Sequence, residues 1–126
     1  MIKDVIGKPY DIDSNPPYTF NCWTLITHLI PNAPNYTDKS LLSIARQFKK
    51  QEAIFKIKGV WVEVSEFIDN DIILFAQKNT FTHAGIYLKN DRILHAKNQA
   101  GVVIEPIRIL KMSFRKVKGY RWLSSK

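Results

Sequence analysis

The chain has one cysteine, Cys22, among its 126 residues, so an internal disulfide is excluded. A fold without disulfides suits synthesis in a reducing compartment. No stretch approaches the ~20 consecutive apolar residues of a membrane-spanning helix, which argues against membrane insertion. The first residues, MIKDVIGKPYDID, lack the apolar core of a secretory signal peptide, so we expect synthesis without one. The chain also lacks internal repeats, low-complexity tracts and linkers.

The composition is that of a single globular domain, predicted to span residues 1–126. Apolar residues make up 45% and charged residues 24% of the chain, which argues against wholesale disorder. The formal net charge is +8, from 19 basic and 11 acidic residues. Such a surface attracts polyanions: nucleic acid, anionic lipid or acidic cell-wall polymers. The charge therefore selects a class of partner and leaves the chemistry open.

The first part of the chain predicts an ordered loop and two helices. Residues 7–20 are rich in Gly, Pro, Asn and Asp and predict the loop. A helix follows, with Asn21 as its N-cap and Pro31 ending it. Its apolar face repeats at helical spacing through Cys22, Leu25, Ile26 and Leu29. Residues 37–53 predict a second helix, capped by Thr37 or Asp38, with an apolar stripe of Leu41, Leu42, Ile44, Ala45 and Phe48.

After Gly59 the pattern changes to short Val/Ile/aromatic runs separated by polar turns: GVWVEV, DIILFA, HAGIYL, RILHA, GVVIEPI and GYRWL. The segment KNDR, between the third and fourth runs, is a hairpin signal. Helices followed by strands predict an α+β domain, in which N-terminal helices pack on a mainly antiparallel sheet of five to six strands.

Cys22 is either a small core residue or a reagent. At the first turn of a helix, its sulfur lies near free backbone N–H groups and the positive end of the helix dipole, which favours the nucleophilic thiolate. Such a thiolate needs a base within hydrogen-bond reach. His28 is on another face of the same helix and is predicted to be exposed or at a boundary, which leaves His83 and His95. A lone buried cysteine can equally be structural.

The turn at KNDR decides whether the two remaining histidines meet. With a two-residue turn, His83 and His95 face opposite sides of the hairpin. With a three-residue turn, Leu88 lies opposite Arg92, and the histidines become diagonal neighbours on one face, roughly 7 Å apart between Cα atoms. One histidine can then take the thiol proton while the other orients it.

Other sites fit the sequence poorly. The segment DIDSN imitates the start of a calcium-binding loop, but Pro16 stands at the position that requires Gly. A zinc site built from the cysteine and the two hairpin histidines matches no standard spacing, so no metal and no cofactor is predicted. Lys/Arg residues alternate with aromatics in FKKQEAIFKIK and KMSFRKVKGYRW, but no nucleic-acid motif accompanies them, so no specific nucleic-acid binding is predicted.

Four segments in order, GKPYDIDSNPPYTFNCWTLI, DIILF, THAGIYL and ILHA, resemble the NlpC-type cell-wall peptidases, compact relatives of the papain-like cysteine peptidases. The family pattern has an aromatic-bearing Gly/Pro loop, a Cys at a helix start, a Gly-Asp-led hydrophobic strand, His-x-Gly-Ile-Tyr, and a polar residue in the next strand. The matches run from about Gly7 to Pro106. The resemblance implies a papain-like, NlpC-type α+β fold.

The resemblance also implies roles for individual residues. Cys22 matches the nucleophile, His83 the general base, and His95 the third residue, which orients the base. Tyr10 matches the tyrosine that lines many such sites, with Tyr18 as the competitor. Further candidates for substrate contact or the oxyanion hole lie around the nucleophile: Asn21, Trp23 and Thr24.

Three positions depart from the family pattern. Asn21 stands where Asp is usual, a mild change because Asn caps helices as well as Asp does. Thr24 replaces Gly or Ser and adds bulk beside the nucleophile, which is expected to narrow the substrate cleft. Asn70 replaces the Gly of the Gly-Asp pair. The three triad positions are kept, so we expect an active enzyme.

The function implied by the resemblance is that of a cysteine peptidase, which hydrolyses an amide bond in the stem peptides of bacterial peptidoglycan. The bond is typically the one between D-glutamate and diaminopimelate or lysine. The CW pair and the GKPY start resemble forms carried by phage tails. We therefore expect an enzyme that is made in the bacterial cytoplasm, joins tail proteins in the virion and acts at the cell wall.

Two alternatives stay open at this point. An amidase, thioesterase or acyltransferase can use the same Cys–His site on another acyl group. In the other alternative, the chain is a catalytically silent tail or binding module in which Cys22 is only packed.

Overall fold

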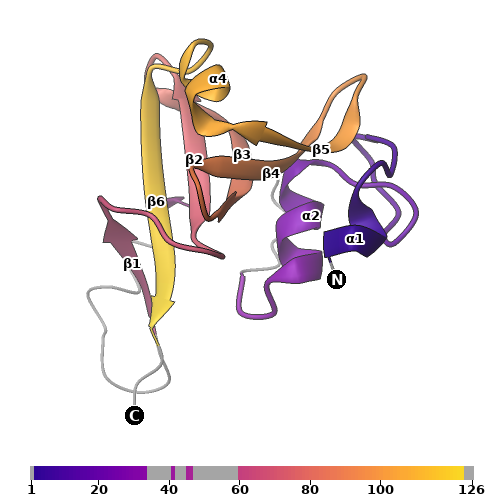
Figure 1. The fold of residues 1–126 in the computed structure, drawn as a ribbon, viewed down its shortest axis with the longest axis horizontal. Helices are drawn as coiled ribbons and strands as arrows, with labels where there is room; N and C mark the ends of the chain where they lie inside the picture. The colour runs from indigo at the N-terminus through magenta and orange to yellow at the C-terminus, as the bar shows by residue number, and fades with distance from the viewer. Residues whose placement is uncertain (1, 34–40, 42–44, 47–59, 124–126) are drawn as a thin grey trace.

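The computed structural model describes residues 2–33, 41, 45–46 and 60–123. Over these residues the chain forms one antiparallel sheet of six strands, in the order β1-β6-β2-β3-β4-β5 (Figure 1). The strands are β1 (Val60–Val64), β2 (Ile72–Gln77), β3 (Thr80–Leu88), β4 (Arg92–Lys97), β5 (Gly101–Pro106) and β6 (Lys116–Leu123). The helices are α1 (Ile2–Val5), α2 (Cys22–Leu29) and α4 (Ile107–Lys111). The predicted α+β class and antiparallel sheet are confirmed.

The observed elements differ from the sequence pattern mainly in two short helices. α1 has four residues and α4 has five, so neither is long enough to show the helical period. α4 begins at Ile107, inside the last residues of the predicted strand GVVIEPI. Pro106 ends β5 there because it has no N–H to continue the ladder. β6 begins at Lys116, ahead of the predicted start at Gly119.

The second predicted helix, residues 37–53, lies outside the described residues except at three positions. Leu41, Ala45 and Arg46 are all helical. Leu41 and Ala45, which belong to the predicted apolar stripe, are buried in the main core.

Two apolar clusters lie on opposite faces of the sheet. The larger one joins α2 to the sheet, and its most buried members include Phe20, Leu25, Ile26, Leu74 and Leu94. The smaller one lies on the α4 side and consists of Ile73, Phe75, Tyr87, Ile93, Ile107 and Leu110, with Phe67, Phe114 and Val117 packed against it. Figure 1 shows α2 and α4 on opposite sides of the β4–β5 ribbon, which runs across the direction of β6. Alternate residues of β3 and β4 therefore face different surroundings.

The start of α2 is fixed by a reciprocal cap. The Asn21 side-chain oxygen accepts hydrogen bonds from the backbone N–H groups of Trp23 (3.0 Å) and Thr24 (2.8 Å). In return, the Asn21 N–H donates to the Thr24 hydroxyl at 2.9 Å. This capping box satisfies N–H groups that a helix start leaves unpaired. It also gives Thr24 a structural use, in addition to the bulk noted at this departure from the family pattern.

The loop before α2 is attached to the edge of the sheet. The N–H of Gly7 donates to the Val102 carbonyl at 2.9 Å, and the N–H of Val102 donates to the Lys8 carbonyl at 2.9 Å. Gly101 has φ +80°, and a Cβ there would lie 2.5 Å from the Lys8 carbonyl oxygen. These contacts fix Tyr10, which forms an isolated bridge with Phe20, close to the β4–β5 hairpin.

The Asn70 departure has a backbone explanation. Asn70 has φ +74°, in the left-handed region where Gly is the default and Asn is the best-tolerated substitute. The following carboxylate, Asp71, is 1% exposed and accepts two 2.9 Å hydrogen bonds from the Arg121 guanidinium. The turn into β2 therefore has a left-handed residue that Asn supplies in place of glycine. Among the described residues, no helix has the length and apolar character to span a membrane.

We predict that Asn21→Ala lowers the free energy of unfolding by about 1 kcal/mol, because two backbone N–H groups lose their acceptor. Asn21→Asp should lose less stability than Asn21→Ala, since a carboxylate also caps the helix. It should still lose some, because it cannot donate to the Ile12 carbonyl as the Asn21 amide does at 3.0 Å. Urea unfolding of the three proteins measures both changes. Equal stability of wild type and Asn21→Ala would contradict the importance of this cap.

Candidate active site

The β3–β4 hairpin has the three-residue connection. Leu88 pairs with Arg92 and Tyr87 with Ile93, as that alternative of the sequence analysis requires. Within the connection, Asn90 and Asp91 have φ values of +68° and +55°. Asn and Asp tolerate this left-handed conformation better than other non-glycine residues. The side-chain parity of the hairpin therefore places both of its histidines on one face.

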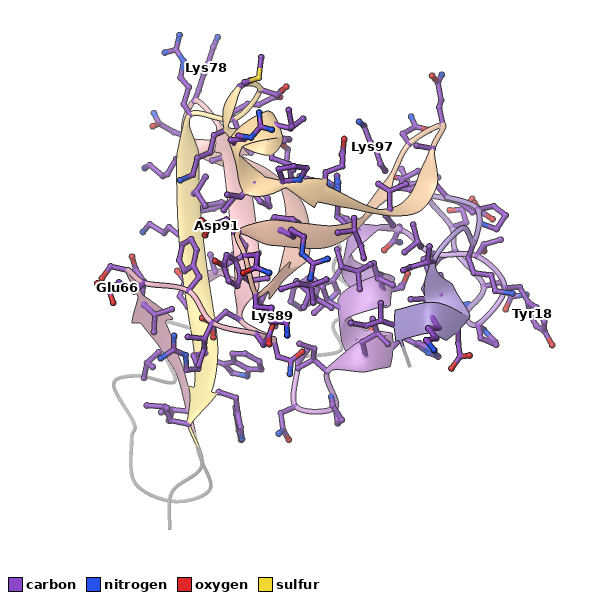
Figure 2. All side chains as sticks on the ribbon, viewed as in Figure 1. Tyr18, Glu66, Lys78, Lys89, Asp91 and Lys97 are labelled. Carbon is purple, nitrogen blue, oxygen red and sulfur yellow. The ribbon has the colours of Figure 1, made fainter. Side chains whose placement is uncertain are left out.

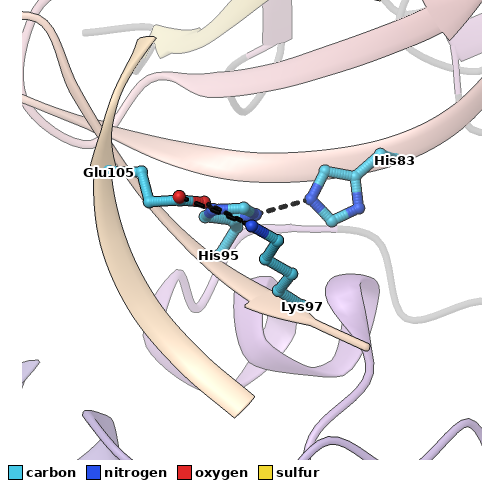
Figure 3. A network of polar contacts seen from close by, with 4 residues as sticks. All are labelled: His83, His95, Lys97 and Glu105. Atoms are coloured by element: carbon cyan, nitrogen blue, oxygen red, sulfur yellow. Dashed lines mark hydrogen bonds and ion pairs between the residues drawn. The ribbon is translucent and has the colours of Figure 1, made fainter. Parts of the chain in front are cut away.

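The two histidines are in direct contact. His83 Nε2 lies 2.7 Å from His95 Nδ1, and the ring planes are nearly perpendicular at 79° (Figure 3). Gly85 permits this close approach of the two strands: a Cβ there would lie 2.5 Å from Ile93 Cγ2 and 3.3 Å from His95 Cβ. A hydrogen bond of 2.7 Å between two imidazoles requires one nitrogen to donate and the other to accept.

The His83 ring packs against two aromatic rings that also contact each other. Phe114 stacks on it at an interplanar angle of 6° with centroids 5.7 Å apart, and the Phe75 centroid lies at 5.9 Å. Burial among these groups and the charge of His95 lower the pKa of His83 to about 4. His83 is therefore a neutral imidazole at neutral pH.

A third member of this network, Glu105, is absent from the sequence prediction. His95 is 2% exposed, and its Nε2 lies 2.8 Å from Glu105 Oε1 (Figure 3). In the β4–β5 register His95 pairs with Val103, so Glu105, two residues on, is its diagonal neighbour on the same face. The same parity argument that paired the histidines could have found Glu105, had it been extended to the GVVIEPI segment.

Glu105 and His95 influence each other's pKa values. Burial raises the pKa of Glu105, but the hydrogen bond and charge of His95, together with the charge of Lys97, bring it below its ordinary value. Burial lowers the pKa of His95, and the hydrogen bond to Glu105 opposes that shift without reversing it. Glu105 is thus an ionised acceptor beside a neutral imidazole at neutral pH.

Cys22 is the first residue of α2 and is partly buried against the main core. Burial raises the pKa of its thiol, while the backbone N–H groups of Ala84, Cys22 and Trp23 act in the opposite direction. The N–H groups at the helix start favour the thiolate, as expected, but desolvation outweighs them and the net pKa of the thiol is raised. The influence of Ala84 places the sulfur against β3 at the residue that follows His83.

Tyr10, and not Tyr18, lies at the histidine pair. A pocket of about 370 Å³ is lined by Tyr10, His83, His95 and Glu105, with α4 and the following loop forming its other wall. Burial and the charges of Cys22 and Asp11 raise the pKa of Tyr10. Tyr18 is 67% exposed at the outer edge of the molecule (Figure 2).

The remaining predicted site residues surround the helix start. Trp23 is 7% exposed and belongs to the main core, and the side chains of Asn21 and Thr24 form the cap. His28 is exposed on α2, where its ring contacts Phe20 at 5.2 Å, away from the His83–His95 pair. Within the described residues, no group of three or more His, Cys, Asp or Glu side chains is arranged to hold a metal ion.

We predict that alkylation of Cys22 by iodoacetamide accelerates as pH rises through the alkaline range. The thiolate reacts, and its fraction grows only as the pH approaches a thiol pKa that burial has raised. His83, with a pKa of about 4, is too weakly basic to form a thiolate–imidazolium pair at rest. Mass spectrometry measures the rate. Fast alkylation on a plateau from about pH 5 to pH 8, abolished by His83→Gln, would contradict this electrostatic description.

The sequence was also compared with known proteins. No curated protein matches the chain. The NlpC/P60 family profile matches residues 7–119, which include Cys22, both hairpin histidines and Glu105. Members of this family are generally cysteine peptidases or amidases that act on peptidoglycan. With this match over most of its length, the chain belongs to the NlpC/P60 family.

Proposed function

We propose that this protein is a cysteine peptidase that hydrolyses an amide bond in peptidoglycan stem peptides. One observation carries the proposal: a partly buried chain of hydrogen bonds, His83–His95–Glu105, lies on β3, β4 and β5, and the backbone N–H of Ala84, the residue after His83, acts on the Cys22 thiol. A thiol, a base beside it and a group that orients the base are the parts that nucleophilic acyl transfer needs.

The proposed reaction follows from the free nitrogen of His83. Its Nε2 is bound to His95, which leaves Nδ1 to accept the thiol proton. As that proton transfers, the Cys22 sulfur attacks the amide carbonyl and forms a tetrahedral oxyanion. The C–N bond then breaks, the leaving amine takes the proton from His83 Nδ1, and a thioester remains on Cys22. Water, deprotonated by His83, hydrolyses the thioester and regenerates the thiol.

A general-base route fits the charges of the site better than a resting ion pair. The thiol pKa is raised and the imidazole pKa is lowered, so both groups are neutral at neutral pH. Charge develops only during attack, when His83 becomes an imidazolium. The ionised Glu105, acting through His95, then stabilises that cation.

Family membership and charge support peptidoglycan as the substrate. The NlpC/P60 family acts on peptidoglycan, and the chain has a formal net charge of +8 that attracts an anionic cell envelope. For the scissile bond we propose the one between D-glutamate and diaminopimelate or lysine, which is supported by the sequence resemblance. A phage-tail setting, tail partners and a virion location stay predictions from that resemblance.

The alternatives share the chemistry of the site. An amidase, thioesterase or acyltransferase would use the same thiol and histidines and would differ in the acyl donor or in the acceptor of the thioester. The products of digestion separate these reactions, because the masses of the released fragments show which bond was cut and whether water or another acceptor took the acyl group. A silent binding module would leave the wall unchanged.

We predict that purified peptidoglycan digested by wild type releases new stem-peptide fragments, identified by mass. Cys22→Ala and His83→Gln should each lower the rate at least about 1,000-fold, because the nucleophile or its base is lost. His28→Gln is the matched control, since His28 is an exposed histidine away from the pair, and it should digest like wild type. Equal silence of folded wild type and Cys22→Ala on several wall types would contradict wall hydrolysis.

A further inference from the structure

The contact between Glu105 and His95 restricts where protons can be. An ionised carboxylate only accepts hydrogen bonds, so the 2.8 Å contact requires His95 Nε2 to carry the proton. His95 is buried and its pKa is lowered, so it holds a single ring proton at neutral pH. His95 Nδ1 is therefore bare and can only accept.

The restriction extends to the next ring. Because His95 Nδ1 can only accept, the 2.7 Å contact with His83 Nε2 requires His83 to donate from that nitrogen. His83 is also neutral, so its one ring proton is used in this bond and its Nδ1 is bare. Without the carboxylate, His95 could hold its proton on Nδ1 instead. His95 Nδ1 would then donate to His83 Nε2, and the His83 proton would move to Nδ1.

We infer that Glu105 is a positioning residue, which sets the tautomers of His95 and His83 so that His83 Nδ1 is available to the Cys22 thiol. Glu105 acts through two imidazoles and does not itself meet the reacting atoms. This role in catalysis rests on the proposed function. The tautomer assignment does not depend on any substrate, so the assignment and the proposed function can fail separately.

Lys97 provides a useful contrast at the same carboxylate. Its ammonium lies 3.4 Å and 3.5 Å from the two Glu105 oxygens, longer than the bond from His95, and its side chain is about half exposed at 49% (Figure 3). Lys97 therefore helps to hold the carboxylate ionised but has no part in the order of donors and acceptors.

The first readout is the tautomer of each histidine ring, measured by long-range ¹H–¹⁵N correlation in ¹⁵N-labelled protein at neutral pH. Wild type and Lys97→Ala should show protonated Nε2 and bare Nδ1 on both His83 and His95. Glu105→Ala should show a mixture of tautomers on both rings. Glu105→Gln replaces the alanine variant if that variant does not fold. An amide can donate or accept, so it no longer determines which ring nitrogen of His95 carries the proton.

The second readout is the rate of peptidoglycan digestion. A carboxylate that supports a catalytic histidine directly can be worth about 10⁴-fold in kcat, and Glu105 acts one ring further away, so we expect Glu105→Gln to lower kcat about 10- to 100-fold. The KM should stay within about twofold, and Glu105→Asp should restore part of the loss. Glu63→Ala, which removes a β1 carboxylate paired with Lys118 of β6, is the control and should digest like wild type.

The outcomes separate the claims. Wild-type tautomers in both Glu105→Ala and Glu105→Gln, or a kcat unchanged in both, would overturn the positioning role. If the Glu105 variants change the tautomers as expected but the wild type digests no peptidoglycan, the proton order stands and the proposed function is rejected.

Discussion

The hydrogen bond between His83 and His95 is the interaction on which the site depends. It joins β3 to β4 at the point where Gly85 lets the strands approach, and a side chain at that position would collide with Ile93. The bond also uses His83 Nε2, which leaves only Nδ1 for chemistry. If the rings were further apart, Glu105 would have no influence on the base.

Burial both limits and directs the chemistry. It raises the pKa of the Cys22 thiol and lowers the pKa of His83, so both of these groups are neutral at rest and the thiol is a poor nucleophile. The same low dielectric strengthens the stabilisation of His83 by Glu105 once the imidazolium forms. In the proposed mechanism, proton transfer from the thiol is therefore coupled to attack on a carbonyl that is already bound.

Sequence alone predicted the class of fold, the six strand segments, α2 with its Asn21 cap and the three triad candidates. It left the hairpin register open, because KNDR suits two turn lengths and the choice depends on left-handed residues within the turn. Glu105 was missed because its position depends on a second register, between β4 and β5. The sequence indicated that the helix start favours the thiolate but not that the net thiol pKa is raised, because the helix dipole is a local property, whereas burial depends on the whole core.

The most direct test of the account is to identify the residue that becomes acylated during turnover. Reactions with soluble stem peptides can be quenched with acid and the protein digested for mass spectrometry, since a thioester survives acid. We expect an adduct on the peptide that contains Cys22, with the mass of the amino-terminal part of the cleaved stem. Acylation of another residue, or continued cleavage after complete alkylation of Cys22, would contradict it.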